Sequence, residues 1–547
     1  MTVNIERLKK WIGDMATLIE KNENPDPLHY TYFLQEPELA LYLVDLIDGL
    51  DESLMDDDRA YYSSCIFALD ICVAQLQAGS ESNNKLAAKT LSQLMTHMAQ
   101  AIASNKHTLS FWLPILNAFY EVHVELSAEL KNAYFELASG EDIETTDEEE
   151  VSHLNSIRDL IQELSDLSLF DIAENFFAQS YAMPADFFTD LVIDLYSIEE
   201  GQDIALLTLL HPKQDVRDVV MSTFEQLMDN ITLSSTSLSR LQAIKHWYPA
   251  IYHEQFNRWI KNQRKKGVVF TSENTHSTLT SLKASEVDGT GAQGIFIHLK
   301  QNRKNRLCGL LFKQGVGIKD AWITPVIPAK DITGYYDESF DDSVMLRGVD
   351  PAYLVMMTNH FLALTIEQGG MPDLHLLEMQ EELGLHFSPQ KLDVAYMIEQ
   401  FAVQISPFTQ DYMQSSLTRS KSWPKNKRFT ESWYVENAQV DKLVNRCCSF
   451  VDGVKVCRFE EALALVFAHE LELHRERWTF HFLWIALWLK AKSRANEKVW
   501  QDSFFIAYAI QTGMPLNEIP IMHEICYQSV VNSIETMQER RTYLNQE

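Results

Sequence analysis

A chain of 547 residues can form several domain-sized cores or one extended array of helices, and a hydrophobic fraction of 46% excludes an intrinsically disordered protein. The formal net charge of −31 is concentrated in residues 1–255, which hold 14 Lys and Arg against 43 Asp and Glu, whereas residues 256–547 hold 32 against 34. A surface of that sign repels nucleic acid and anionic lipid, so it favours a basic protein partner or simple solubility.

Residues 1–266 predict a succession of amphipathic helices with short connections. Segments of this kind begin near Glu38, Arg59, Asn84 and Ser110. The acidic segment 139–150 interrupts the series, and its composition predicts a solvated loop. We therefore expect a first helical domain over residues 1–138 and a second helical block over residues 151–266.

One segment of the second block, residues 204–230, resembles a HEAT repeat unit. Its apolar first helix ends near Pro212, and Asp215, Val216 and Arg217 open an apolar second helix. The resemblance implies helix pairs stacked into a curved surface that binds other macromolecules. The flanking segments have suitable helix lengths but lack this signature.

The second block closes with a single helix predicted over residues 237–267. Basic side chains gather at its end, at Arg264, Lys265 and Lys266. Cations there interact favourably with the negative end of the helix dipole, so the group is interpreted either as a capped, solvated helix end or as an anion-binding site.

Residues 267–335 change to period-two alternation with repeated glycines, which predicts a small antiparallel sheet. Ile295, Ile297 and Leu299 fall on one face of a strand, and Phe296, His298 and Lys300 fall on the other. Residues 301–305 then reverse the chain, which predicts a hairpin with a basic tip. The candidate binding residues at this tip are Arg303, Lys304 and Arg306.

Residues 336–547 predict a helical C-terminal domain. Asp350 is a plausible N-cap with Pro351 at the first helical position, and the helix should stop at Gly369 and Gly370. Ser388 and Pro389 repeat that start signal for the next helix, and residues 459–492 predict one long apolar helix. Its core, Phe480–Leu489, is about half the length of a membrane span, so it predicts a buried helix and no membrane partner.

Residues 409–435 are polar, basic and aromatic, which predicts a long loop. Its basic candidates are Lys425, Lys427 and Arg428, which follow Trp423 and precede Trp433. Basic side chains interleaved with exposed aromatics suit phosphate contact with base stacking, and they equally suit the rim of a protein interface or a contact with the chain's own acidic helices.

The seven cysteines have no regular spacing, and the charged start MTVNIERLKK lacks the apolar run of a signal peptide. These features predict a cytoplasmic protein with reduced thiols. Cys447, Cys448 and Cys457 lack the CxxC spacing of a zinc knuckle, so we interpret them as small buried side chains.

Motifs that would indicate a reaction centre are missing from the sequence. His469 and His474 are five apart, which separates them by about 140° on a regular helix and prevents them from sharing a metal. GxxxxGK[ST] and GxSxG do not occur, and the glycines of residues 289–294 introduce a strand. We therefore predict no catalytic residue, no metal site and no cofactor. Acidic residues within 334–342, near Lys300 and Lys313, leave a hydrolase site beside the sheet as a remote alternative.

The predicted fold is mostly α, a HEAT-like helical array with a small inserted antiparallel sheet and a helical C-terminal domain. The predicted function is that of a non-enzymatic scaffold or adaptor, which binds a protein partner through a helical surface and the basic hairpin tip. A nucleic-acid-associated protein that uses the basic patches is the first alternative, and the hydrolase is the second.

Overall fold

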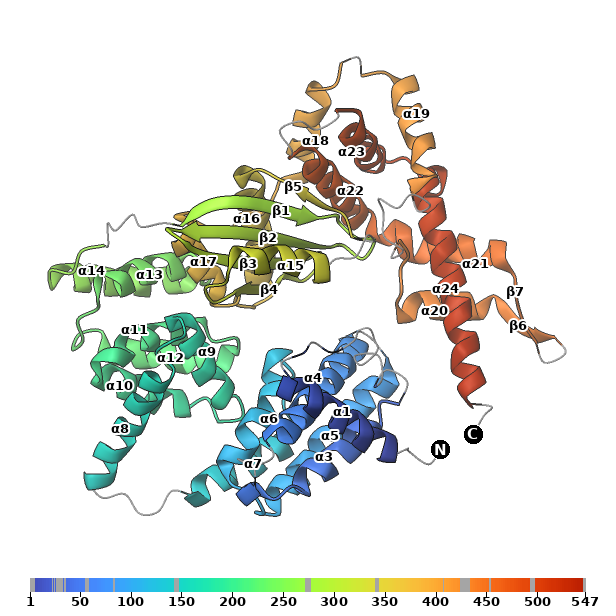
Figure 1. The fold of residues 1–547 in the computed structure, drawn as a ribbon. Coiled ribbons are helices and arrows are strands. Elements are labelled where there is room, and N and C mark those ends of the chain that lie inside the picture. The colour runs from blue at the N-terminus through green and yellow to red at the C-terminus, as the bar shows by residue number, and fades with distance from the viewer. Residues whose placement is uncertain are drawn as a thin grey trace. The chain divides into compact units, whose positions relative to one another are not determined.

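The computed structural model describes residues 5–544 except 22, 24, 26–32, 34–35, 55–58, 82–83, 142–146, 271–276, 340–343, 407, 424–432, 452–453 and 492–496. The chain divides into two compact units, Met1–Thr208 and Leu209–Glu547. Figure 1 shows that helices dominate, with a five-stranded sheet and a small two-stranded hairpin inserted among the helices of the second unit. The predicted mostly α fold with an inserted antiparallel sheet and a helical C-terminal region is confirmed.

The first unit is built from helices. They are α1 (Ile5–Lys21), α3 (Leu39–Asp48), α4 (Arg59–Glu81), α5 (Lys85–Ala103), α6 (Leu109–Glu121), α7 (Ala128–Glu141), α8 (Asp147–Glu163), α9 (Leu169–Gln179), α10 (Phe187–Ser197) and α11 (Gln202–Leu207). Apolar side chains at helical spacing form its core, and Leu43, Leu69 and Leu94 are fully buried there. The Asn84 side chain caps α5 by accepting from the amides of Leu86 and Ala87.

The acidic segment 139–150 was predicted to be a loop, and this prediction is wrong for both of its ends. Its first residues complete α7, and α8 begins at Asp147. Residues 142–146 lie outside the described residues. The helical segment predicted to begin at Ser110 is not one helix, because it contains two separate helices, α6 and α7.

The second unit is organised around a five-stranded antiparallel sheet. Its strands are β1 (Thr278–Ser285), β2 (Ala292–Gln301), β3 (Lys304–Lys313), β4 (Gly317–Ile323) and β5 (Leu346–Gly348), in the order β4-β3-β2-β1-β5. The predicted alternation is confirmed, because Ile295 and Ile297 are fully buried and Leu299 is 1% exposed. Each of these side chains stabilises the fold by about 1.5–3 kcal/mol through burial. β5 extends the sheet beyond the predicted limit of residue 335.

Helices cover both faces of the sheet. The helices of the second unit are α12 (Gln214–Leu227), α13 (Ser235–Lys245), α14 (His253–Lys265), α15 (Ala329–Ser339), α16 (Pro351–Glu367), α17 (His375–Leu383), α18 (Val394–Val403), α19 (Gln410–Ser420), α20 (Ala438–Arg446), α21 (Phe459–Val466), α22 (Arg475–Lys490), α23 (Glu497–Gln511) and α24 (Pro520–Leu544), and only some of them contact the sheet. In Figure 1, α15 crosses one face, called the outer face here, and α16 lies on the other, the inner face.

A buried polar network fixes the inner face to two helices. The Tyr353 hydroxyl of α16 donates to Gln293 Oε1 of β2 at 2.6 Å, and the Trp484 indole of α22 donates to the same oxygen at 3.1 Å. Phe361 of α16 stacks on Phe312 of β3 with ring centroids 4.8 Å apart. Satisfied polar groups within an apolar core specify one arrangement of strand and helices.

The predicted start of α16 is confirmed, and the predicted start of the following helix is wrong. The Asp350 side chain accepts from Tyr353 N, with Pro351 at the first helical position. After the break at Gly369, α18 begins at Val394 and is capped by Asp393, not at Ser388. Asp393 sets the start of α18 because its carboxylate accepts a hydrogen bond from Tyr396 N, which satisfies an otherwise free amide of the first turn.

Three further predictions about the second unit need correction. The predicted helix over residues 237–267 is two helices, because Pro249 cannot continue α13. The predicted loop 409–435 contains α19, capped by Thr409. The predicted long helix 459–492 is broken by a π turn at Phe467–Leu471 and a 3₁₀ turn before α22. Within α22, every residue from Trp478 to Leu489 is buried, which confirms the predicted core helix.

The cysteine interpretation is also wrong in part. Cys448 on β6 (Cys448–Val451) and Cys457 on β7 (Val454–Cys457) are paired across a two-stranded hairpin and form a disulfide. The five other cysteines, Cys447 among them, are buried thiols as predicted. Sequence spacing could not reveal the disulfide, because it depends on strand register.

The segment that resembles a HEAT repeat spans the boundary between the two units. Its first helix is the short α11, and its second is α12. The Arg217 guanidinium donates to the carbonyl oxygens of His211 and Pro212 at 2.8 and 2.7 Å, and to that of Gly369 at 3.0 Å. Arg217 therefore closes the turn before α12 and joins it to the end of α16.

Candidate interaction site at the end of the sheet

The hairpin of β2 and β3 ends in a tight turn that carries exposed cations. Gln301 pairs with Lys304, which leaves Asn302 and Arg303 as the two turn residues. Asn302 has φ +57°, a left-handed conformation that asparagine adopts more readily than most residues. The turn therefore holds the Arg303 backbone at the end of a paired ladder.

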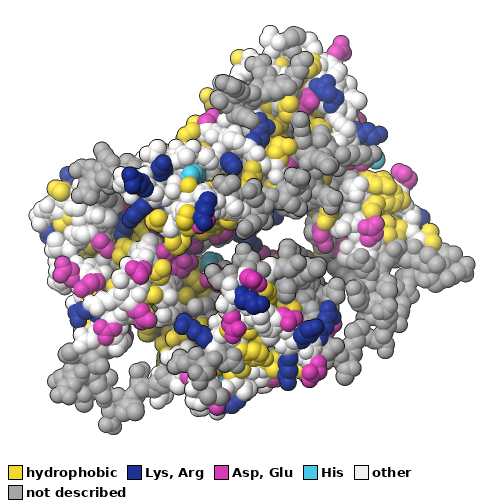
Figure 2. Space-filling model, viewed as in Figure 1, with side chains coloured by type: hydrophobic (Ala, Val, Ile, Leu, Met, Phe, Trp, Pro, Cys, Tyr) yellow, Lys and Arg dark blue, Asp and Glu magenta, His cyan; other side chains and the backbone are white. Residues whose placement is uncertain are grey.

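Three side chains at this turn, Lys300, Arg303 and Lys304, are exposed, and we call them the basic tip. None of them forms an ion pair within the part of the chain that the structure describes. Figure 2 shows Lys and Arg side chains clustered over the end of the sheet where this turn lies. Two of the three, Arg303 and Lys304, were candidates from the sequence, and Lys300 joins them.

Arg306 does not belong to the basic tip, contrary to the sequence prediction. Its guanidinium lies 2.8 Å from a Glu378 oxygen and 3.2 Å from a Glu382 oxygen, and it also donates to Thr324 O. Burial lowers the pKa of Arg306, but these two carboxylates outweigh it and raise the pKa above its ordinary value. Arg306 is a structural cation that joins β3 to α17.

The basic cluster at the end of α14 is only partly available. The Lys266 ammonium donates to the carbonyl oxygens of Met228 and Asp229, so it caps a neighbouring turn. Arg264 and Lys265 are exposed, and the Arg264 guanidinium lies 5.7 Å from the centroid of the Phe270 ring.

The third basic cluster, in the predicted loop 409–435, has no exposed tryptophan beside it among the described residues. Trp423 and Trp433 are 8% and 2% exposed, so they are core residues and not a stacking surface. Trp433 packs against the Phe482 ring of α22 at 5.9 Å. Arg419 is paired with Asp502. The predicted binding residues Lys425, Lys427 and Arg428 lie outside the described residues.

Beside the basic tip, the outer face carries a half-exposed group of aromatic and cationic side chains. Lys283 of β1 lies 3.8 Å from the centroid of the Tyr336 ring of α15. Trp322 of β4 crosses β3 at Gly309, where a Cβ would lie 2.2 Å from the indole, so only glycine fits. The His298 Nε2 atom lies 3.1 Å from Asn305 Oδ1. These side chains form a polar and aromatic surface next to the basic tip, and Lys283 is its cation.

The Glu–His pair and the cleft that could have indicated a catalytic or metal site have polar residues that are already bonded within the protein. Glu470 is buried on the π turn and accepts from Asn437 Nδ2 at 2.7 Å, while His474 Nε2 lies 3.8 Å away from it. The acidic residues 340–342, part of the hydrolase alternative, lie outside the described residues. A cleft of about 630 Å³ lies between α16 and residues 390–397. Of its polar lining residues, Asn359 and Asp393 accept hydrogen bonds from backbone amides and Lys391 is paired with Glu367.

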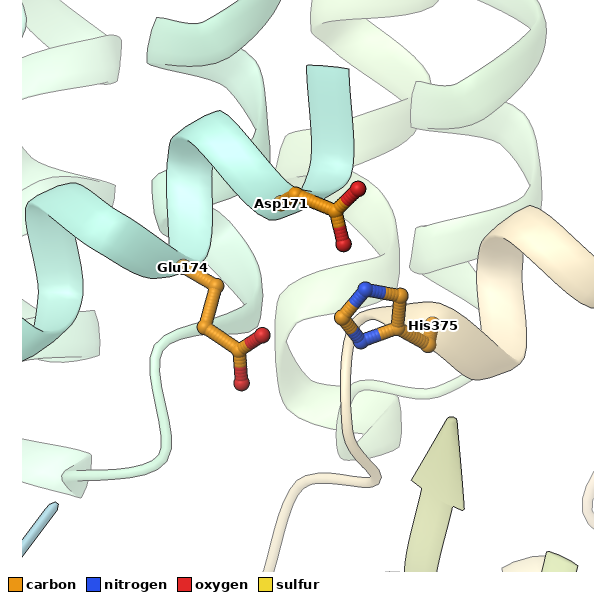
Figure 3. A group of neighbouring side chains, drawn as sticks. All are labelled: Asp171, Glu174 and His375. Atoms are coloured by element: carbon orange, nitrogen blue, oxygen red, sulfur yellow. The ribbon is translucent and has the colours of Figure 1, made fainter. Parts of the chain in front are cut away.

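Two carboxylates and one histidine are drawn in Figure 3. Asp171 and Glu174 lie on successive turns of α9 in the first unit, where Asp171 and Ser168 form a reciprocal cap with bonds of 3.0 and 3.1 Å. His375 begins α17 in the second unit, and its Nδ1 atom lies 2.9 Å from Asp373 Oδ1. Asp171 and His375 are thus each positioned by contacts inside their own unit.

Comparison with known proteins relates parts of this chain to a helical family. Residues 395–534 match the family described as the Y4lR C-terminal helical domain, and residues 184–267 match the Y4lR second domain. Uncharacterized protein y4lR of Sinorhizobium fredii is 23% identical over 327 residues, which cover 59% of this chain. The chain spans 60% of the length of that relative. No solved structure matches.

The strands that carry the basic tip lie outside both matched family domains. A search of the described helices for an apolar stretch long enough to cross a membrane finds none.

Proposed function

We propose that this protein is a non-enzymatic scaffold or adaptor whose basic tip binds a short acidic segment of a protein partner. The observation that carries the proposal is a contrast: Lys300, Arg303 and Lys304 are exposed and form no ion pair with any described residue, whereas the neighbouring Arg306 is held by Glu378 and Glu382. Cations fixed on a paired ladder lose little conformational entropy on binding, which favours recognition of carboxylates.

A short acidic segment fits this site better than nucleic acid does. With a Debye length of about 8 Å at physiological ionic strength, an acidic segment confined to the tip is screened from most of the protein's −31 charge. The burial of Trp423 and Trp433 also removes the aromatic surface on which bases would stack.

The helices of the first unit supply a second docking surface in this proposal, in keeping with the resemblance of residues 204–230 to a HEAT repeat. We place the protein in the cytoplasm of a bacterial cell. The five free thiols are typical of a reducing compartment, and the Cys448–Cys457 disulfide is the exception to that pattern.

The direct test is fluorescence anisotropy with a labelled ten-residue peptide rich in Glu and Asp. The variant K300E/R303E/K304E should weaken peptide binding at least about tenfold, since each exposed ion pair contributes about 0.2–1 kcal/mol and reversal turns attraction into repulsion. Arg306 is left unchanged, because a third carboxylate beside Glu378 and Glu382 would unfold the site.

The matched control K421E/K442E/R446E reverses three exposed cations elsewhere in the second unit and should bind the peptide as the wild type does. Equal affinity of the tip variant and the wild type would refute the proposal. A labelled single-stranded DNA is titrated in parallel. If DNA binds more tightly than the peptide and falls steeply with salt, the nucleic-acid alternative replaces the protein partner.

A further inference from the structure

The end of α14 presents exposed cations beside exposed apolar side chains. Lys261, Arg264 and Lys265 are exposed on its last two turns, and Val269 and Phe270 follow shortly after the helix. Val269 is 67% exposed and Phe270 is 39% exposed. We call these five residues the α14 patch. Adjacent apolar side chains that remain in water gain free energy when a partner covers them.

The backbone of the α14 patch is fixed by the way the helix ends. Gly267 has φ +94°, and the amides of Gly267 and Val268 donate to Arg264 O and Gln263 O at 3.1 and 3.2 Å. These two bonds form a Schellman motif, in which a left-handed glycine turns the chain away from the helix axis. After this turn, the Phe270 ring centroid lies 5.7 Å from the Arg264 guanidinium.

Two side chains anchor the same helix end to the turn that follows α12. The fully buried Gln263 amide donates to Met228 O and Ile231 O, both at 3.1 Å. The Lys266 ammonium donates to Met228 O and Asp229 O at 3.0 and 2.8 Å. Because this backbone is already ordered, binding a partner here costs little conformational entropy of the chain.

The cations of the α14 patch are available to carboxylates. Arg258, on the preceding turn, is paired with Glu225 at 2.8 Å. In contrast, Lys261, Arg264 and Lys265 form no ion pair with any residue that the structure describes. An acidic ligand can therefore approach these three cations without displacing an internal carboxylate, which favours a partner of opposite charge.

We propose that the α14 patch is a docking surface for a protein segment in which an aromatic or large apolar side chain is flanked by carboxylates. The apolar side chain packs on Val269 and Phe270, and the carboxylates pair with the cations. This ligand differs from the acidic segment proposed for the basic tip, because part of its affinity is apolar and is not screened by salt. The net charge of −31 opposes the approach of an anionic bilayer and so favours a protein segment.

The test is fluorescence anisotropy of the full chain with two labelled ten-residue peptides. One carries Phe and Leu at its centre with Glu and Asp on both sides, and the other has Ser in place of Phe and Leu. The wild type should bind the apolar peptide at least about fivefold more tightly than the serine peptide, because only the former buries apolar surface. V269S/F270S should remove this preference, and K261Q/R264Q/K265Q should weaken binding of the apolar peptide.

Two controls locate the effect. V403S/L473S removes two exposed apolar side chains elsewhere in the second unit and should keep the preference for the apolar peptide. K300E/R303E/K304E should keep it as well, so failure of the basic tip and failure of the α14 patch give different results. Val269 and Phe270 are exposed and lie beyond the helix, so V269S/F270S is expected to fold, which circular dichroism checks.

The proposal is overturned if the wild type binds both peptides equally, or if V269S/F270S keeps the preference of the wild type. Vesicles of phosphatidylserine and phosphatidylcholine are sedimented with both proteins in parallel. Vesicle binding that V269S/F270S loses, in a wild type without a preference for the apolar peptide, would assign the α14 patch to a lipid surface and would likewise overturn the proposal.

Discussion

The turn of the β2–β3 hairpin and the strand that follows it contrast within a few residues. Arg303 and Lys304 point into solvent without an ion pair in the described chain, whereas Arg306 is held by Glu378 and Glu382. Arg303, Lys304 and Arg306 are equivalent by residue type and lie close together in the sequence. Nevertheless, Arg303 and Lys304 are available to a binding partner and Arg306 is not. Availability for binding depends on where each side chain falls relative to the sheet.

The strand periodicity explains this difference. β3 places Arg306 on the same face as Cys308, Leu310 and Phe312, all of which are buried against the inner helices. A cation on that face loses its hydration and must be paired. The basic tip lies past the point where helices cover the sheet, so its cations keep their water.

The largest expected effect in this comparison is the loss of stability on replacing Arg306. Arg306→Ala leaves two carboxylates close together without their shared cation, so we expect a loss of about 3–5 kcal/mol in the free energy of unfolding of the second unit. Nine of the eleven tryptophans lie in that unit, so urea denaturation followed by tryptophan fluorescence measures it.

The matched change at the turn, Arg303→Ala with Lys304→Ala, should alter the free energy of unfolding by less than about 0.5 kcal/mol. If Arg306→Ala cost no more than this double variant, the division of the hairpin into a binding end and a structural end would be wrong.

Glu286, directly after β1, should give a pH-dependent effect of up to about 3 kcal/mol. It is 4% exposed, and neither carboxylate oxygen meets standard hydrogen-bond geometry with a described residue, although the Met345 backbone lies near enough to lower the pKa in part. Burial, with the nearby Asp288, raises its pKa to about 7. The folded state therefore keeps a proton that the unfolded chain releases near pH 4.5. The stability from Glu286 is full below that value and is lost as the pH rises toward 7.

Glu286→Gln should consequently gain stability relative to the wild type as the pH is raised from 5 to 8. His360 and His481 act in the opposite sense, because burial lowers their pKa values to about 4 and about 3. The comparison of variant with wild type at each pH cancels their contribution. The exposed control Glu399→Gln should show no such trend. A difference independent of pH would contradict a buried, protonated Glu286.

A smaller effect is expected at the β6–β7 hairpin. A thiol-specific reagent should find five thiols in the denatured, unreduced chain and seven after reduction, since the chain has seven cysteines and two are joined. The variant C448S/C457S should give five in both conditions. Seven thiols before reduction would show that the disulfide does not form in the purified protein.

Local patterns predicted much of the fold and little of the site. Alternation predicted which faces of β2 are buried, and the Asp350 and Pro351 signal predicted the start of α16. Both depend on residues close together in sequence. Period two also places Arg306 on the buried face, and this signal could have removed it from the candidate list.

Other features depend on contacts between distant segments, which no local pattern contains. Glu378 lies 72 residues after Arg306, and Trp433 is buried by the Phe482 ring of α22. Pro249 could have indicated the break between α13 and α14, since proline cannot continue a helix, but a single helix was predicted there.

The central claim is that charge complementarity at the basic tip selects the partner, and a charge-swap titration tests it most directly. An acidic peptide should bind the wild type and not K300E/R303E/K304E, while the same peptide with Lys in place of its acidic residues should bind the reversed variant more tightly than the wild type. Rescue of this kind cannot arise from misfolding. If the acidic peptide bound both proteins equally, or the lysine peptide failed to prefer the reversed variant, the basic tip would not be the binding site.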